Sequence, residues 1–117
     1  MRHTRALYII GVLLLASCGK QYDAEQTVKD FVEANMEHAD QIKGQDFGDL
    51  GTTRLISDSL IGIMRQRGAT NYRQGINYGK VPTGDLYYLR MRYVDGNDTL
   101  NNTFYLNQEL TEVVAFK

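Results

Sequence analysis

Residues 86–116, LYYLRMRYVDGNDTLNNTFYLNQELTEVVAF, decide the fold of this chain. Apolar and polar side chains alternate through the stretch with a period of two, which is typical of strands with one buried face. Two turn sequences interrupt the alternation, DGND at residues 95–98 and NQE at residues 107–109. The stretch therefore predicts three consecutive antiparallel strands, at residues 86–94, 99–106 and 111–116.

The first of these strands has two chemically different faces. Tyr87, Leu89, Met91 and Tyr93 share the face that we expect to point toward the interior, and the opposite face carries Tyr88, Arg90 and Arg92. Arginine beside tyrosine is the composition of many contact surfaces. We therefore expect the second face to bind a protein or a small ligand. An ordinary solvated face with cross-strand stacking is the alternative.

Two helices are predicted upstream. Residues 23–40 place apolar side chains at helical spacing, with Asp23 as N-cap and Gln26 in the capping-box position. Residues 53–67 form a second amphipathic segment that ends at Gly68. The glycine-rich residues 44–51 between them predict a loop, and the alternation at residues 72–78 predicts one more strand. The whole pattern is α+β, with two N-terminal helices packed on a four-stranded antiparallel meander.

The order of these elements, the size of the chain and the closing hairpin FYLNQELTEVVAF resemble the cystatin-like and NTF2-like group over residues 22–117. Small lipoproteins of that group, some in uncharacterised families of Bacteroidota, begin in much the same way. The group contains enzymes, ligand binders and inert modules, so the resemblance implies a fold and not an activity.

The N-terminus has the features of a secretory leader. Arg2, His3 and Arg5 precede residues 6–16, in which only Gly11 is not apolar. As a helix this apolar run would rise roughly 17 Å, whereas a bilayer core is about 30 Å thick. We therefore expect a signal peptide and not a stable transmembrane anchor.

The leader ends in Leu15-Ala16-Ser17-Cys18, which resembles the lipobox of bacterial lipoproteins. The resemblance implies that Cys18 is lipidated and becomes the N-terminus, and that its acyl chains hold the protein on a membrane. In such lipoproteins an aspartate directly after the cysteine implies retention at the inner membrane. This chain has Gly19 at that position, which implies the outer membrane. The expected organisation is a signal peptide at residues 1–17, the lipidated cysteine and a tether at residues 18–22, and one α+β domain at residues 23–117.

Composition excludes several classes of function. The chain of 117 residues carries 13 Lys and Arg against 14 Asp and Glu, and this balance argues against a nucleic-acid partner. A single cysteine excludes an internal disulfide framework and a cysteine-rich metal site. His38 is the only histidine after the leader and is expected to be solvated. Asp46 and Asp49 lack the dense oxygen pattern of a calcium loop, so turn and cap roles explain them better.

Two functional hypotheses remain. The first is a non-enzymatic, lipid-anchored envelope module without cofactor or metal that binds a partner through its sheet. The second is a small hydrolase or isomerase that uses a pocket between helix and sheet. In NTF2-like enzymes such as ketosteroid isomerase, a tyrosine and an aspartate work together inside the domain. Here Tyr87 and Tyr93 face the predicted interior, but no acidic residue shares that face of the predicted strand, which favours the first hypothesis.

A possible modification site follows the first hairpin turn. Asp98-Thr99-Leu100 and Asp58-Ser59-Leu60 both resemble the Asp-Ser/Thr-aliphatic acceptor of O-glycans on exported proteins of some Bacteroidota. Ser59 lies in a predicted amphipathic helix, whereas Thr99 follows a turn, so Thr99 is the expected acceptor. Ordinary turn and strand chemistry also explains both residues.

Overall fold

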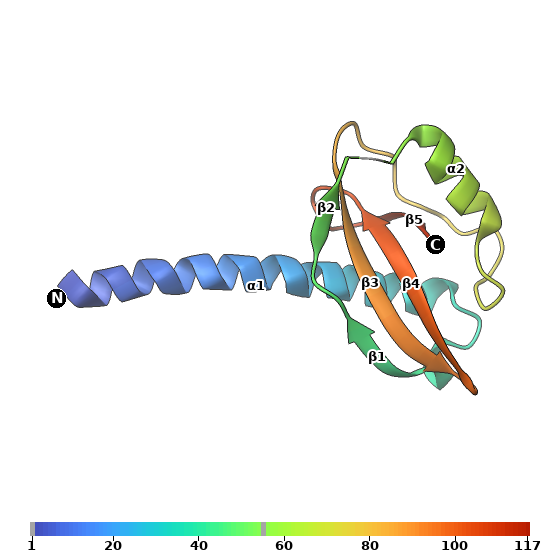
Figure 1. Ribbon diagram of the computed structural model, residues 1–117, viewed down its shortest axis with the longest axis horizontal. Coiled ribbons are helices and arrows are strands. Elements are labelled where there is room, and N and C mark those ends of the chain that lie inside the picture. Colours follow the sequence, from blue (N-terminus) through green and yellow to red (C-terminus); the bar gives the residue numbers. More distant parts are fainter. Residues whose placement is uncertain (1, 55) are drawn as a thin grey trace.

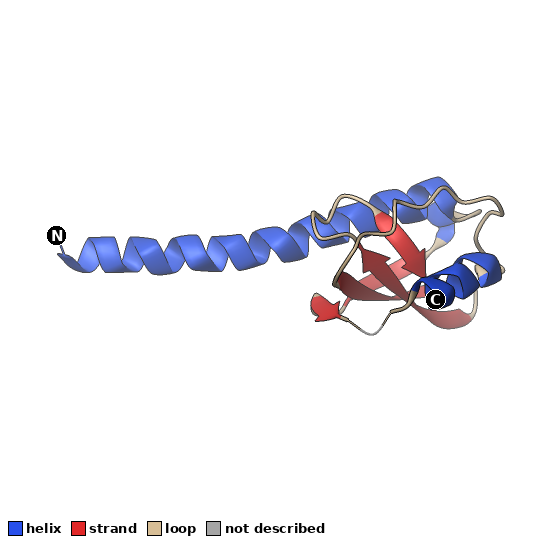
Figure 2. Ribbon diagram, turned by 90° about the horizontal axis from the view of Figure 1, so that it is seen from above, coloured by secondary structure: helices blue, strands red, loops and turns tan. Residues whose placement is uncertain are grey.

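The computed structural model describes residues 2–54 and 56–117, with side chains from residue 19 onward. It confirms the α+β class (Figure 1). One long helix runs along the sheet and extends well beyond it toward the N-terminus, and a short helix lies at the other side of the domain (Figures 1 and 2). In chain order the elements are α1 (Arg2–Asn35), the 3₁₀ turn η1 (Ala39–Gln41), β1 (Lys43–Phe47), β2 (Gly51–Thr53), α2 (Asp58–Arg67), β3 (Leu86–Asp95), β4 (Asp98–Leu106) and β5 (Val113–Phe116).

The sheet has five antiparallel strands in the order β1-β3-β4-β5, and β2 also pairs with β3. The longest pairing joins β3 to β4, from Tyr87 opposite Leu106 to Asp95 opposite Asp98. Gly96 has a φ of 62° in the turn between them, a left-handed conformation that glycine adopts without strain. The three strands predicted in residues 86–116 are thus confirmed, and the last begins at Val113 rather than at residue 111.

Two predictions about the other strands are wrong. Residues 44–51 are not a loop, because most of them belong to β1 and β2, which pair with β3. Residues 72–78 are not a strand of the sheet. Residues 71–73 instead pair with residues 35–37, where α1 ends: the Arg73 amide donates to the Asn35 carbonyl at 2.7 Å and the Glu37 amide donates to the Asn71 carbonyl at 3.1 Å.

The helix boundaries also differ from the prediction. α1 ends at Asn35 and not near residue 40, because the chain turns at Met36 to pair with Tyr72. α2 begins at Asp58 and not at residue 53. Ser57 caps this helix, because its side chain accepts a hydrogen bond from the Leu60 amide at 3.2 Å. Its predicted end at Gly68 is confirmed. Residues 18–22, the predicted tether, lie within α1.

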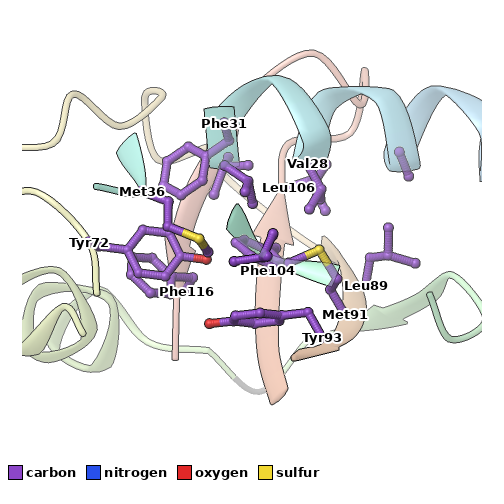
Figure 3. Packing of buried hydrophobic residues seen from close by; sticks show 14 of the residues in the cluster. Val28, Phe31, Met36, Tyr72, Leu89, Met91, Tyr93, Phe104, Leu106 and Phe116 are labelled. Atoms are coloured by element: carbon purple, nitrogen blue, oxygen red, sulfur yellow. The ribbon is translucent and has the colours of Figure 1, made fainter. Parts of the chain in front are cut away.

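The main core lies between α1 and the inner face of the sheet. Phe31 of α1 packs edge-on against Phe104 and Phe116, with ring centroids 5.8 Å apart in both pairs. Tyr72 lies on Phe116 with centroids 4.4 Å apart, and Figure 3 shows these rings gathered at one end of the cluster, with Leu89 and Met91 of β3 beyond them. Side chains therefore fill the space between this helix and the sheet.

A second, smaller core lies on the other side of the sheet, under α2. Ile61 and Met64 of α2 are buried there against the sheet residues Leu86, Tyr105, Val114 and Ala115. α1 and α2 thus cover opposite faces of the sheet (Figure 2). On this outer face, Leu86 at one end of β3 is buried, whereas the outer-face residues farther along β3, from Tyr88 to Val94, are exposed.

Candidate functional site

The residues predicted to form a contact surface lie together on the outer face of β3. Tyr88 is 38% exposed, and Arg90 and Arg92 are exposed. On the inner face of the same strand, Leu89, Met91 and Tyr93 are buried as expected, while Tyr87 is partly buried. The alternation of the sequence therefore separates the two faces of β3 correctly.

Neighbouring strands extend this exposed surface, because residues directly opposite each other in a sheet share a face. Thr103 and Asn101 of β4 lie opposite Arg90 and Arg92, and Asp46 of β1 also lies opposite Arg92. We call this set, together with Tyr88, the outer patch. Within the described residues neither arginine forms an ion pair or a side-chain hydrogen bond, since the one ion pair found there joins Arg54 to Asp85. The two guanidinium groups are therefore free to bind.

A glycine on β2 determines how Tyr88 lies. Gly51 is opposite Tyr88, and a Cβ atom added to Gly51 would come within 2.5 Å of Cζ of the tyrosine ring. The ring therefore crosses the strand and covers the bare backbone of Gly51, an arrangement known to compensate for glycine in sheets. This contact fixes the Tyr88 ring over Gly51, so the aromatic group of the outer patch is already ordered.

The interior contains a polar network that the sequence did not reveal. The hydroxyl groups of Tyr72 and Tyr93 both donate to Oδ1 of Asn102, at 3.2 and 2.6 Å. Nδ2 of Asn71 donates to the Tyr93 hydroxyl at 2.9 Å and to Oδ2 of Asp95 at 3.3 Å. The expectation that no acidic residue shares the inner face of this strand is therefore wrong. β3 continues to Asp95, the first residue of the predicted turn DGND.

Both tyrosines of this network are buried in the core. Burial raises the pKa of Tyr72 and of Tyr93 above that of free tyrosine. Both hydroxyls therefore keep their protons at neutral pH and act as fixed hydrogen-bond donors. Tyr93 is 1% exposed, and Phe31, Phe104 and Phe116 fill the space between α1 and the sheet. The carboxylate of Asp95 is near Tyr93, since both accept a hydrogen bond from Nδ2 of Asn71, and the space beside them toward α1 is filled by packed side chains.

The remaining predicted positions are distributed over the chain. Cys18 lies in α1, and its side chain is outside the described residues. His38, Asp46 and Asp49 are exposed. No group of three potential metal ligands occurs among the residues described, and none of the described helices is both long and apolar enough to cross a membrane.

The two possible glycan acceptors are both accessible. Thr99 is exposed on β4 opposite Val94, which places it on the outer face of the sheet. Ser59 is also exposed, in the first turn of α2. The expected difference in accessibility between the two hydroxyls is therefore not observed, and only the local backbone, strand or helix, distinguishes them.

A cavity of about 550 Å³ lies where α2 ends, at a place for which the sequence predicts no site. Arg65, Arg67 and Arg73 line it together with Tyr72 and Tyr78. The arginines come from the last turn of α2 and from the irregular segment that follows, so no local periodicity links them. A long segment without regular secondary structure inside a compact domain was the one available signal, because such segments are often functional.

Comparisons with protein-family models, with curated proteins and with solved structures found no match to this chain.

Proposed function

We propose that this protein is a lipid-anchored, non-enzymatic module of the bacterial envelope that binds a partner through the outer patch of its sheet. The binding proposal rests on one observation, that α2 covers only part of the outer face of the sheet. Leu86 is buried under α2, whereas Tyr88, Arg90 and Arg92 on the same face of β3 are exposed. The two cations without partners and the ordered aromatic ring are the types of group that dominate binding energy at interfaces.

The charges on the patch favour an acidic protein surface as the partner. Arg90 and Arg92 are joined on the outer face by Lys117, whose backbone pairs with Thr103 in both directions, at 2.8 and 3.0 Å. Asp46 is the acidic side chain placed opposite Arg92. Arginine binds carboxylates through two parallel hydrogen bonds, so aspartate or glutamate side chains on a flat partner surface would fit this face.

Replacement of both arginines tests the binding proposal. Because neither side chain has a partner within the described structure, Arg90→Ser with Arg92→Ser should change the thermal midpoint little and abolish capture of the partner from envelope extracts. Arg54→Ser is the matched control, since this arginine is also exposed but pairs with Asp85 away from the patch. Equal capture by the double variant and the wild type would remove the outer patch from consideration.

The anchor has a separate test. Cys18→Ala should leave an unprocessed precursor without lipid, and metabolic labelling with palmitate detects this directly. Unchanged labelling of the variant would show that the lipid is not on Cys18.

The proposed outer-membrane location can be tested at Gly19. No described atom lies within 4 Å of the Cβ position of Gly19, so Gly19→Asp fits without steric conflict. This variant should move the protein to the inner membrane in fractionated cells, whereas Gly19→Ser should not. Outer-membrane recovery of both variants would contradict the proposed sorting signal.

Glycosylation at Thr99 is a further part of the proposal and would affect binding. Thr99 lies on the same face of the sheet as Asn101 and Thr103 of the outer patch, two and four residues along β4. A glycan there would restrict access to Arg92. Intact-mass measurement of protein from the native host should show a sugar-sized excess that Thr99→Ala removes and Ser59→Ala does not. A mass equal to that of the bare lipidated chain would reject the modification.

A further inference from the structure

The cavity at the end of α2 has an unusual charge balance. Three of its lining residues are the arginines Arg65, Arg67 and Arg73, and the one acidic lining residue is Glu37. No ion pair joins Glu37 to any of them in the described structure. The cavity therefore carries excess positive charge, although the chain as a whole has a net charge of −1.

Arg65 is held rigidly in this position. Its Nε donates to the Val114 carbonyl at 2.9 Å, and its Nη2 donates to the Gly79 carbonyl at 2.8 Å. The guanidinium also lies over the ring of Tyr78, 5.0 Å from the centroid. All of these partners are uncharged, and they leave Nη1 without a described partner. A half-buried cation without a counter-ion is costly, and an anion in the cavity would remove that cost.

Tyr78 provides a second polar group without a partner. Its hydroxyl is buried and makes no hydrogen bond in the described structure, which is rare for a buried donor. Tyr78 and Arg65 both line the cavity, and Tyr72 and Ile76 add apolar surface to the same wall. Because the Tyr78 oxygen itself is buried, a ligand would meet the ring rather than the hydroxyl. The site thus combines cations with an apolar side, within the size range of small-molecule sites.

We propose that this cavity binds a small organic anion, a carboxylate with an aromatic or aliphatic body. The carboxylate would lie against the guanidinium groups, and the apolar body would contact Ile76 and Tyr78. Arg67 and Arg73 are exposed at the cavity and would bind the carboxylate from the solvent side. The site shares no lining residue with the outer patch, so failure of one proposal would leave the other unaffected.

Indole-3-acetate is a suitable probe, with the neutral indole-3-acetamide as its matched control. The full-length protein, labelled with ¹⁵N and kept in a neutral detergent, is titrated with each compound while amide shifts are recorded. Indole-3-acetate should shift the amides of residues 65–78, and the acetamide should bind at least about tenfold more weakly because it cannot form charge-assisted hydrogen bonds.

Two variants locate the binding. Arg67→Gln and Arg73→Gln should each weaken indole-3-acetate binding by about three- to tenfold, because each removes one cation from the cavity. Arg92→Gln, on the outer patch, should bind as the wild type does, and thermal midpoints confirm that all variants are folded. Equal affinity for acid and amide, unchanged binding in both cavity variants, or no shift up to about 10 mM ligand would overturn the proposal. Binding of inorganic phosphate without binding of indole-3-acetate would also overturn it, since it would exclude the organic body.

Discussion

Asn102 links two buried tyrosines, and removing their hydroxyls singly and together gives a quantitative test of the interior. In Tyr72→Phe, Oδ1 of Asn102 loses a 3.2 Å hydrogen bond but keeps the 2.6 Å bond from Tyr93. The expected loss of stability is about 1 kcal/mol, the net value of one hydrogen bond. Tyr93→Phe should cost more, about 1–2 kcal/mol, because Asn71 also loses the nearer of its two acceptors and keeps only Oδ2 of Asp95 at 3.3 Å.

The double variant should cost more than the sum of the single variants. With both hydroxyls removed, Oδ1 of Asn102 has no donor, and the residue is only 8% exposed. An unpaired buried acceptor adds about 1–2 kcal/mol, which is the coupling energy that a double-mutant cycle measures. Urea unfolding followed by circular dichroism is the assay, since the chain has no tryptophan.

A control and a rescue complete this test. Tyr87→Phe removes a hydroxyl that makes no hydrogen bond in the described structure, so stability should change by less than about 0.5 kcal/mol. Adding Asn102→Leu to the double variant should recover part of the loss, because it removes the unpaired acceptor. If the two tyrosine substitutions are simply additive, Asn102 does not couple them and the reasoning is refuted.

Three further predictions concern other parts of the fold. Burial raises the pKa of Tyr72, so above about pH 10 the folded state keeps a proton that the unfolded chain releases. The free energy of unfolding should therefore fall as the pH rises above about 10, by up to about 1.4 kcal/mol per pH unit. Urea midpoints measure this decline, and Tyr72→Phe should flatten it. Gly51→Ala should cost about 1–2 kcal/mol, because its Cβ would lie 2.5 Å from a tyrosine ring. Gly48→Ala should cost less than about 1 kcal/mol, because its Cβ would lie 3.7 Å from Cβ of Arg90, and thermal unfolding of both variants decides this. Arg65→Met should lower stability by about 2 kcal/mol through loss of two hydrogen bonds to carbonyls, while the exposed Arg67→Met should change it little, again by urea unfolding.

The parts of the fold that could be predicted are those set by local pattern. β3 and β4 have a strict alternation around a turn that needs a glycine at Gly96, so their faces and their pairing follow from sequence. β1 could not be found in this way, because it lies at the edge of the sheet with four of its five residues exposed and has no apolar period. The alternation at residues 72–78 was misleading, since that segment uses its backbone to pair with the end of α1.

The candidate sites differ in the same way, because one follows from local pattern and the other depends on contacts between distant segments. Tyr88, Arg90 and Arg92 share a face because successive residues of a strand alternate, and this follows from sequence alone. The arginine-lined cavity depends on contacts between distant segments, such as the bond from Arg65 to the Val114 carbonyl. The same holds for Asp95, whose place in the interior network became visible only with the true end of β3. No local pattern carries that information.

The continuity of α1 sets how the domain would move on a membrane. Gln21 is already fixed to the domain, because its side-chain Nε2 donates to the Gly48 carbonyl at 3.0 Å and its Oε1 accepts from the Leu50 amide at 2.8 Å. Ala24, one turn later, is fully buried. Ala24 lies six residues beyond Cys18, about 9 Å along a helix axis. With lipid on Cys18, no flexible segment would separate the lipid from the domain, so the domain could neither reach far from the bilayer nor tumble freely. Any tilt of the helix would tilt the sheet by the same angle, and the set of partners that Arg90 and Arg92 can meet would depend on that angle.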